Sequence, residues 1–144
     1  MLIGLDPLLT PELLYALRAM GHGDEIVVVD GNFPAESWGP RLVRVDGAGA
    51  PAVVDAILSV MPLDHEADAA AWRPDVVGAD GLALPIFVEF AEVVTRRAGE
   101  RFAPLGVARS AFYERSKKAY AIVATGERRF HGNIILRKGV VPPA

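Results

Sequence analysis

The feature that most constrains the fold is a predicted helix that ends at a glycine and is followed at once by a short apolar strand. Residues 10–20 open with Thr10-Pro11-Glu12, which supplies an N-cap hydroxyl, a proline in the first turn and an acid beside the helix start. Apolar side chains then recur at helical spacing until Gly21, a residue type that commonly ends helices. Residues 25–29 read Glu-Ile-Val-Val-Val, and such a short β-branched run predicts a buried strand.

The rest of the chain continues this alternation of helices and short strands. The patterns predict helices over 35–38, 51–61, 85–98 and 110–119, the last capped by Ser110, and strands over 42–45, 120–125 and 133–136. The last two strands are expected to be partners across a turn at Gly126-Glu127. Residues 62–82, rich in Pro, Asp, Ala and Gly, are expected to form a variable loop. The alternation predicts an α/β fold: one compact three-layer domain over residues 1–144, with helices packed on both faces of a central β-sheet.

Composition narrows the class of protein. Hydrophobic residues make up 51% of the 144 positions, which argues against disorder. A net charge of -3 and the lack of a basic run give no footprint for nucleic acid or for a membrane surface. Without cysteine, the sequence excludes disulfides, a thiolate nucleophile and zinc–thiolate sites. Asp6 and Pro7 interrupt the N-terminal apolar residues, and no apolar run approaches the ~20 residues that span a bilayer, so we expect a cytoplasmic protein.

The run Gly21-His22-Gly23 places one imidazole between two glycines just before the strand at 25–29, and Asp30 follows that strand. Flanking glycines allow positive φ and the close approach of a ligand. A free histidine titrates near pH ~6.5, so its proton exchanges readily at physiological pH. Carboxyl ends of strands are where α/β sheets tend to bind ligands, which favours a role for Asp30. The structural alternatives are a histidine that caps the preceding helix and an Asx turn at Asp30.

Two further segments carry polar side chains of interest. Arg109 is expected to bind either the hydroxyls of a ligand or a surface carboxylate. The segment His131-Gly132-Asn133 again places polar residues beside a glycine, and it forms either a ligand contact or simply a hairpin turn. Tyr113, Glu114 and Arg115 occupy consecutive helix positions and cannot all face one pocket, so most of that segment is expected to be structural. The histidines and aspartates match no compact metal motif, and phosphate-binding and dinucleotide fingerprints are missing. The residues alone therefore predict a small polar ligand, proton transfer and no cofactor.

Ordered stretches of the chain resemble the fucose mutarotase and ribose pyranase family, on its fucose mutarotase side. These stretches are residues 8–30 (LLTPELLYALRAMGHGDEIVVVD), 32–35 (NFPA), 45–47 (VDG), 112–119 (FYERSKKA), 121–127 (AIVATGE) and 132–140 (GNIILRKGV). They cover both ends of the chain and most of its predicted strands, while the middle matches only loosely.

The resemblance implies a cofactor-free isomerase that interconverts the α and β anomers of a free monosaccharide, L-fucose or a similar pyranose, by acid/base ring opening and closing. It implies His22 as the acid/base, and Asp30, Arg109 and the segment His131-Gly132-Asn133 as substrate-binding residues. It also implies a homo-oligomer, from a dimer up to a decamer, with sites near subunit interfaces. The implied partner is a small sugar, and no metal is implied.

One departure from the family's pattern falls on this implied site. The family usually carries Tyr-Gly-Asn where this chain has His131-Gly132-Asn133. Because an imidazole both donates and accepts hydrogen bonds, we expect His131 to contact the sugar in place of the phenol and to act as a second acid/base. Two alternative functions remain. One is a ribose-type pyranose–furanose interconversion, against which Asn32-Phe33-Pro34 and Arg109 argue, and the other is a non-catalytic monosaccharide-binding protein.

Overall fold

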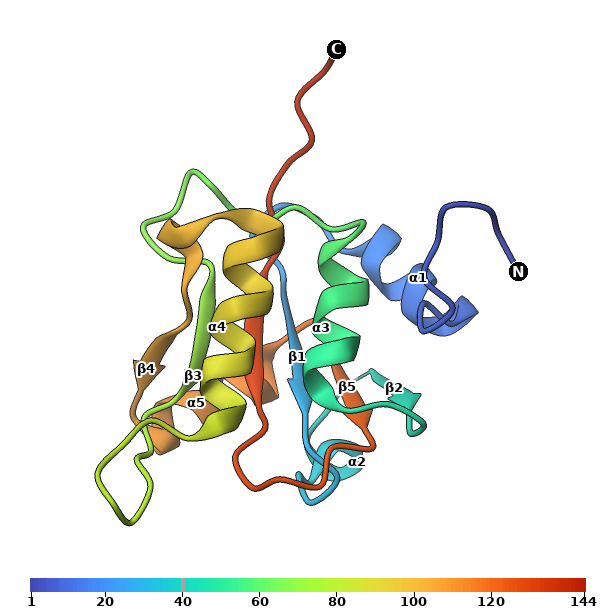
Figure 1. Ribbon diagram of the computed structural model, residues 1–144. Helices are drawn as coiled ribbons and strands as arrows, with labels where there is room; N and C mark the ends of the chain where they lie inside the picture. Colours follow the sequence, from blue (N-terminus) through green and yellow to red (C-terminus); the bar gives the residue numbers. More distant parts are fainter. Residues whose placement is uncertain (40) are drawn as a thin grey trace.

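One mixed β-sheet with helices on both faces forms the framework of the computed structural model, which describes residues 1–39 and 41–144 (Figure 1). The elements are α1 (Pro11–Ala19), β1 (Glu25–Val29), α2 (Ala35–Trp38), β2 (Leu42–Val45), α3 (Ala50–Leu58), β3 (Ala71–Pro74), α4 (Pro85–Ala98), the 3₁₀ turn η1 (Glu100–Phe102), β4 (Leu105–Val107), α5 (Arg109–Lys118), β5 (Ala121–Thr125) and β6 (Ile134–Arg137). The strand order is β2-β5-β1-β6-β3-β4. β6 runs antiparallel to both β1 and β3, and the other strand pairs are parallel.

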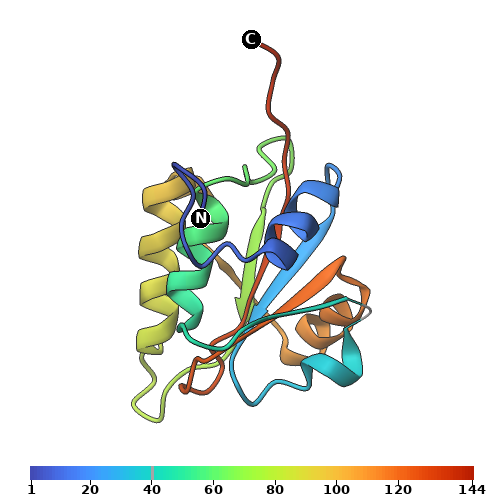
Figure 2. The same cartoon turned by 90° about the vertical axis from the view of Figure 1, so that its right-hand side faces the viewer.

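The side chains of β1 show why helices pack on both faces of the sheet. Its side chains alternate between two separate cores: Ile26 and Val28 belong to the core that α3 and α4 share, whereas Val27 and Val29 belong to the core beneath α5. All four are fully buried, as the continuous apolar run predicts. Figure 2 shows α3 and α4 on one side of the sheet and α2 and α5 on the other. The predicted three-layer α/β architecture is therefore confirmed.

Two sequence-based expectations about the strands are wrong. Residues 62–82 are more than a variable loop, because β3 lies within them and pairs with β4 and β6. β3 has only four residues, one of them proline, so its extended conformation comes from its neighbours in the sheet rather than from a local pattern. The strands at 121–125 and 134–137 are not partners either, because β1 lies between them. Residues 126–133 consequently cross the end of β1, next to Asp30.

The starts of two helices test the capping predictions. The Leu13 N–H donates to Thr10 Oγ1 at 3.2 Å, which confirms the N-cap of α1. Ser110, in contrast, is already inside α5, whose N-cap is Ala108 without a side-chain cap, so the cap predicted at Ser110 is wrong.

Among the described residues, no helix combines the length and the apolar character needed to cross a membrane.

Candidate functional site

A cavity of about 270 Å³ opens where β1 and β5 end and β6 begins. Because β1 and β5 are parallel, their carboxyl ends meet at this edge, the position at which α/β sheets commonly bind ligands. The volume lies just below the ~300–1,000 Å³ typical of drug-sized ligands, which suits a smaller molecule. The lining residues are Asp30, Asn32, Phe33, Pro34, Trp38, Tyr113, Phe130, His131 and Asn133.

Asp30 and Asn133 form the polar floor of this cavity. Asp30 is 5% exposed, and its Oδ1 accepts a hydrogen bond from the Asn32 N–H at 2.9 Å, which is the Asx turn considered from the sequence. Among the described residues no donor reaches Oδ2 of the same carboxylate, so this oxygen is available to a ligand hydroxyl. The Asp30 N–H donates to Asn133 Oδ1 at 2.8 Å, which leaves Asn133 Nδ2 as the donor of that amide.

The chain from His131 to Asn133 runs against Asp30 because residue 132 has no side chain. A Cβ atom on Gly132 would lie 2.8 Å from Glu127 Cγ and 3.5 Å from Asp30 Cβ. The preceding residue, His131, has a φ of 62°, in the left-handed region that residues other than glycine rarely adopt. His131, Gly132 and Asn133 are therefore brought together with Asp30 at one edge of the sheet.

Aromatic side chains form the opposite wall. The rings of Phe33 and Trp38 and the rings of Trp38 and Tyr113 each meet edge to face, with centroids 5.3 Å apart. Arg109 does not line the cavity itself, but its Nη2 donates to the Tyr113 hydroxyl at 3.2 Å. Arg109 thus reaches the site through a residue that does line it.

His22 lies at the other end of β1. Its Nε2 is 3.1 Å from Oδ1 of Asp64, whose side chain is 8% exposed, whereas the His22 ring is 42% exposed. Gly23, with a φ of 85°, turns the chain after His22 toward β1. The hydrogen bond from His22 is the main reason why the pKa of Asp64 lies below its ordinary value despite its burial. An ionised Asp64 is an acceptor for Nε2–H, and in that tautomer the ring carries its lone pair on Nδ1.

The structure therefore does not bring His22 to the cavity of its own chain. β1 separates His22 from Asp30, and five residues of strand alone extend over about 16 Å. Proton transfer needs heavy atoms about 3 Å apart. A molecule seated against Asp30 and Asn133 is thus out of reach of the same chain's His22.

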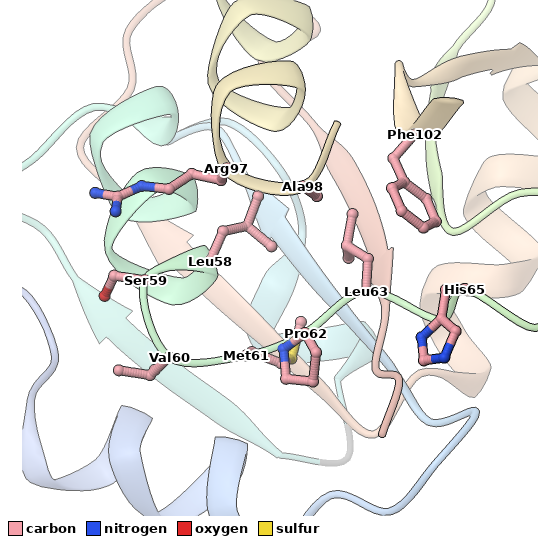
Figure 3. A pocket seen from close by; sticks show the side chains of 10 residues that line it. All are labelled: Leu58, Ser59, Val60, Met61, Pro62, Leu63, His65, Arg97, Ala98 and Phe102. Atoms are coloured by element: carbon pink, nitrogen blue, oxygen red, sulfur yellow. The ribbon is translucent and has the colours of Figure 1, made fainter. Parts of the chain in front are cut away.

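A larger cavity of about 460 Å³ lies at the C-terminal ends of α3 and α4 (Figure 3). Its polar side chains are largely engaged in the fold: Ser59 Oγ donates to the Ala56 carbonyl at 2.6 Å, and Arg97 donates twice to Asp55, at 2.7 and 2.8 Å. In Figure 3 the Arg97 side chain extends across α3, while His65 stands at the other side of the cavity. The smaller cavity at Asp30 is the better candidate because Asp30 Oδ2 and Asn133 Nδ2 have no hydrogen-bond partner among the described residues.

The residues considered as metal ligands are split between the two ends of the sheet. His22 pairs with Asp64 at one end, and Asp30 and His131 lie at the other. Over residues 1–39 and 41–144, no group of three histidine, aspartate or glutamate side chains is arranged to hold a metal ion.

Two residues of the site escaped sequence reasoning. Asp64 falls in the segment interpreted as a variable loop, where a single acid gives no signal, and only the fold places it beside His22. Tyr113 belongs to the helix segment expected to be mostly structural. The structure separates the roles along α5: Tyr113 lines the cavity, while Arg115 turns away to donate to Glu25.

Known proteins resemble this chain over almost its whole length. The model of the RbsD / FucU transport protein family matches residues 3–141. The fucose mutarotase of Homo sapiens is 49% identical over 144 residues, a match that covers 96% of this chain and 93% of the human protein. The crystal structure of the fucose mutarotase from Streptococcus pneumoniae in complex with L-fucose superposes with a TM-score of 0.90 at 42% identity, covering 98% of this chain and 100% of that one.

A more distant structure shares the fold. Bacillus subtilis RbsD complexed with D-ribose has a TM-score of 0.73 at 18% identity, with 93% of this chain and 95% of that chain covered. The mixed six-stranded sheet is thus common to both groups of structures, while the sequence similarity is concentrated in the fucose mutarotases.

Proposed function

Because this chain belongs to the RbsD / FucU family, we propose that it is a fucose mutarotase, an isomerase that interconverts the α and β anomers of L-fucose or of a pyranose with similar stereochemistry. The observation that carries the proposal is the 49% identity to a fucose mutarotase across 96% of the chain. The likeness to a fucose mutarotase bound to L-fucose supports the same class of substrate. At 18% identity, the D-ribose complex supports the fold alone.

The reaction requires two proton transfers, at the two oxygen atoms that are bonded to the anomeric carbon. A base removes the proton of the anomeric hydroxyl, an acid delivers a proton to the ring oxygen, and the bond between the anomeric carbon and the ring oxygen breaks to give the open aldehyde. Rotation and the reverse steps close the ring as the other anomer. Both oxygens are bonded to the same carbon, so one imidazole can take the proton from one and return it to the other. Neither a covalent intermediate nor a redox cofactor enters this balance.

His22 is the group we assign to this proton shuttle. The Asp64 carboxylate fixes the ring through Nε2 and stabilises the imidazolium that forms when Nδ1 accepts the proton. Asp30 Oδ2, Asn133 Nδ2 and the ring of His131 are the groups we assign to the sugar hydroxyls, because these three residues line the cavity. Arg109 supports that wall through the Tyr113 hydroxyl.

The separation of His22 from the cavity leads us to propose that a second copy of the chain completes each site. His22 and the cavity lie at opposite ends of β1, so the contact joins two different surfaces of the two copies. Such head-to-tail contacts close into rings when the rotation between copies permits. This arrangement supports a homo-oligomer whose sites lie at its subunit interfaces.

Saturation transfer between the anomeric protons of α- and β-L-fucose tests the proposal. We expect the protein to accelerate the exchange and His22→Ala to reduce the enhancement at least about 100-fold, the usual contribution of a positioned acid/base. Asp64→Asn should also lower it, because the amide no longer stabilises the imidazolium. His65→Ala is the matched control, because this exposed histidine lines the larger cavity and not the cavity at Asp30, and the variant should exchange like the wild type.

The results with L-fucose and D-ribose distinguish a mutarotase from a sugar-binding protein and from a ribose-type enzyme. If L-fucose binds saturably and its anomers exchange no faster than in buffer, the chain is a sugar-binding protein and the enzymatic proposal is wrong. Faster exchange with D-ribose than with L-fucose would instead point to the pyranose–furanose reaction.

A further inference from the structure

The loop formed by residues 126–133 joins β5 to β6 and carries His131 and Asn133, two of the polar residues that line the cavity at Asp30. His131 adopts its left-handed backbone conformation in the middle of this loop. Such conformations persist in residues other than glycine only where the surroundings hold them. The contacts that hold this one are therefore informative about the site.

Arg129, two residues before His131, is held by two carboxylates at once. Its Nε and Nη2 donate to Glu127 Oε1 and Oε2 at 2.9 and 3.0 Å. Its Nη1 and Nη2 donate to Glu89 Oε1 and Oε2, on α4, at 2.5 and 3.1 Å. Both pairs are bidentate, a geometry that fixes the guanidinium plane as well as its position. We call Glu89, Arg129 and Glu127 the Arg129 clasp.

Glu127 connects the clasp to the surrounding framework. Its side chain is 6% exposed, and its Oε2 accepts a hydrogen bond from the N–H of Ala50, the first residue of α3, at 3.3 Å. Its main-chain carbonyl accepts from the Gly31 N–H at 2.8 Å, directly after Asp30. The clasp therefore ties the loop to α3, to α4 and to the end of β1.

The other side of His131 is anchored equally closely. The Asn133 N–H donates to the His131 carbonyl at 2.7 Å, and Asn133 Oδ1 accepts from the Asp30 N–H. His131 is thus held between two fixed points, Arg129 before it and Asn133 after it. Neither Arg129 nor Glu89 faces the floor of the cavity formed by Asp30 and Asn133.

We propose that the Arg129 clasp is the positioning device of the sugar site: it holds the loop so that His131 and Asn133 meet the sugar hydroxyls in one fixed arrangement. This inference rests on the proposed function, because it concerns the same cavity. Arg129 is a positioning residue rather than a catalytic one.

The clasp predicts a specific kinetic signature. It fixes groups that hold the sugar in the ground state and the transition state alike, whereas the proton shuttle assigned to His22 sits at the other end of β1. Loosening the clasp should therefore raise KM and leave kcat nearly unchanged. Arg129→Lys keeps the charge beside the buried Glu127 and loses the bidentate fork. We expect it to raise the KM for L-fucose about tenfold, with kcat within about threefold of the wild type.

Two further variants complete the design. Glu89→Gln removes the charge and one acceptor oxygen from the contact with α4 only, and it should raise KM about threefold, less than Arg129→Lys does. The matched control is Asp55→Asn, which breaks a similar link between α3 and α4, through Arg96 and Arg97, at a distance from the sugar cavity. It should lower the melting temperature and leave KM unchanged.

Hydrogen exchange of the loop amides provides a second measurement that needs no activity. Arg129→Lys should speed exchange in residues 128–133 while the amides of β1 stay protected, and Asp55→Asn should leave the loop as in the wild type. Wild-type KM together with wild-type loop protection in Arg129→Lys would overturn the inference. So would an Asp55→Asn variant that raises KM equally, because the effect would then follow overall stability.

The same experiment separates this inference from the proposed function. A wild-type protein that does not accelerate anomer exchange contradicts the function. Loop protection that depends on Arg129 would in that case still support the positioning role for the binding of sugar.

Discussion

Glu127 shows what a single residue contributes to this protein. Its carboxylate is nearly completely buried, yet it is ionised, because the half-exposed guanidinium of Arg129 lies against it. The hydrogen bond from Arg129 is the main cause that lowers the pKa of Glu127 from its ordinary 4.5 to about 2. A buried charge of this kind is stable only while its partners remain in place.

Because the pKa of Glu127 is lowered in the folded state, we expect the protein to lose stability at acidic pH. The ionised form is favoured in the folded state, so Glu127 contributes its full stabilisation above about pH 4.5 and loses it as the pH falls through about 2. We expect Glu127→Gln to lower the free energy of unfolding by about 2 kcal/mol at pH 6, a value reduced to allow for the solvent around Arg129. The difference from the wild type should shrink toward pH 2.5, as followed by urea unfolding.

The control for this prediction is Glu36→Gln, whose carboxylate is 82% exposed and pairs with Arg44 at the surface. Neutralising it should change stability by less than about 0.5 kcal/mol at either pH. A Glu127→Gln deficit that stays constant from pH 6 to 2.5 would show that packing, and not the charge, is responsible.

At the scale of elements, the crossing of the β5–β6 loop over the end of β1 builds the cavity at Asp30. β6 returns antiparallel on the far side of β1 from β5, so the loop must pass Asp30. The absence of a side chain at Gly132 allows this passage, because a Cβ there would lie 2.8 Å from Glu127 Cγ and 3.3 Å from the Arg129 carbonyl oxygen.

Gly132→Ala should therefore displace the loop from Asp30. We expect an affinity for L-fucose at least about tenfold lower, measured by titration calorimetry, with a stability loss of about 1–3 kcal/mol from overpacking. Gly47→Ala is the matched control, since a Cβ at Gly47 meets no atom within 4 Å, and it should bind like the wild type. Equal affinity in Gly132→Ala and the wild type would mean that the passage beside Asp30 does not shape the site.

At the scale of the whole molecule, the distance between the two ends of β1 decides how a site can be assembled. The cavity and His22 lie at opposite ends of β1, whose five residues alone extend over about 16 Å. If sites are shared between copies, mixing a variant that lacks His22 with a variant that has a damaged cavity should restore activity by complementation.

Mixed oligomers of His22→Ala and Asp30→Asn test this expectation. In a one-to-one mixture, about a quarter of the interfaces pair an intact His22 edge with an intact cavity, so we expect about a quarter of the wild-type exchange rate. A mixture of His22→Ala with Asp64→Ala is the control, because both changes damage the same edge and should recover little. Activity no higher than the average of the two parents would argue that each chain works alone.

The sequence by itself determined the elements with strong local signals. The Thr10 cap, the proline at the start of α1 and the apolar run of β1 act through neighbouring residues, so their patterns carry the information. The alternation of helices and strands likewise fixed the layered α/β class. Asp30, His131 and Asn133 were found from their positions beside strand ends and glycines, and the fold places them around one cavity.

Only the tertiary structure decided the strand order, the extended state of β3 and the partners of the charged groups. β3 owes its conformation to β4 and β6, and β5 and β6 are separated by β1, because pairing depends on contacts between residues distant in the chain. The pairing of His22 with Asp64 and the Arg129 clasp have the same origin. A sequence pattern shows which side chains can take a proton or hold a charge, whereas the packing of the whole sheet decides which of them meet.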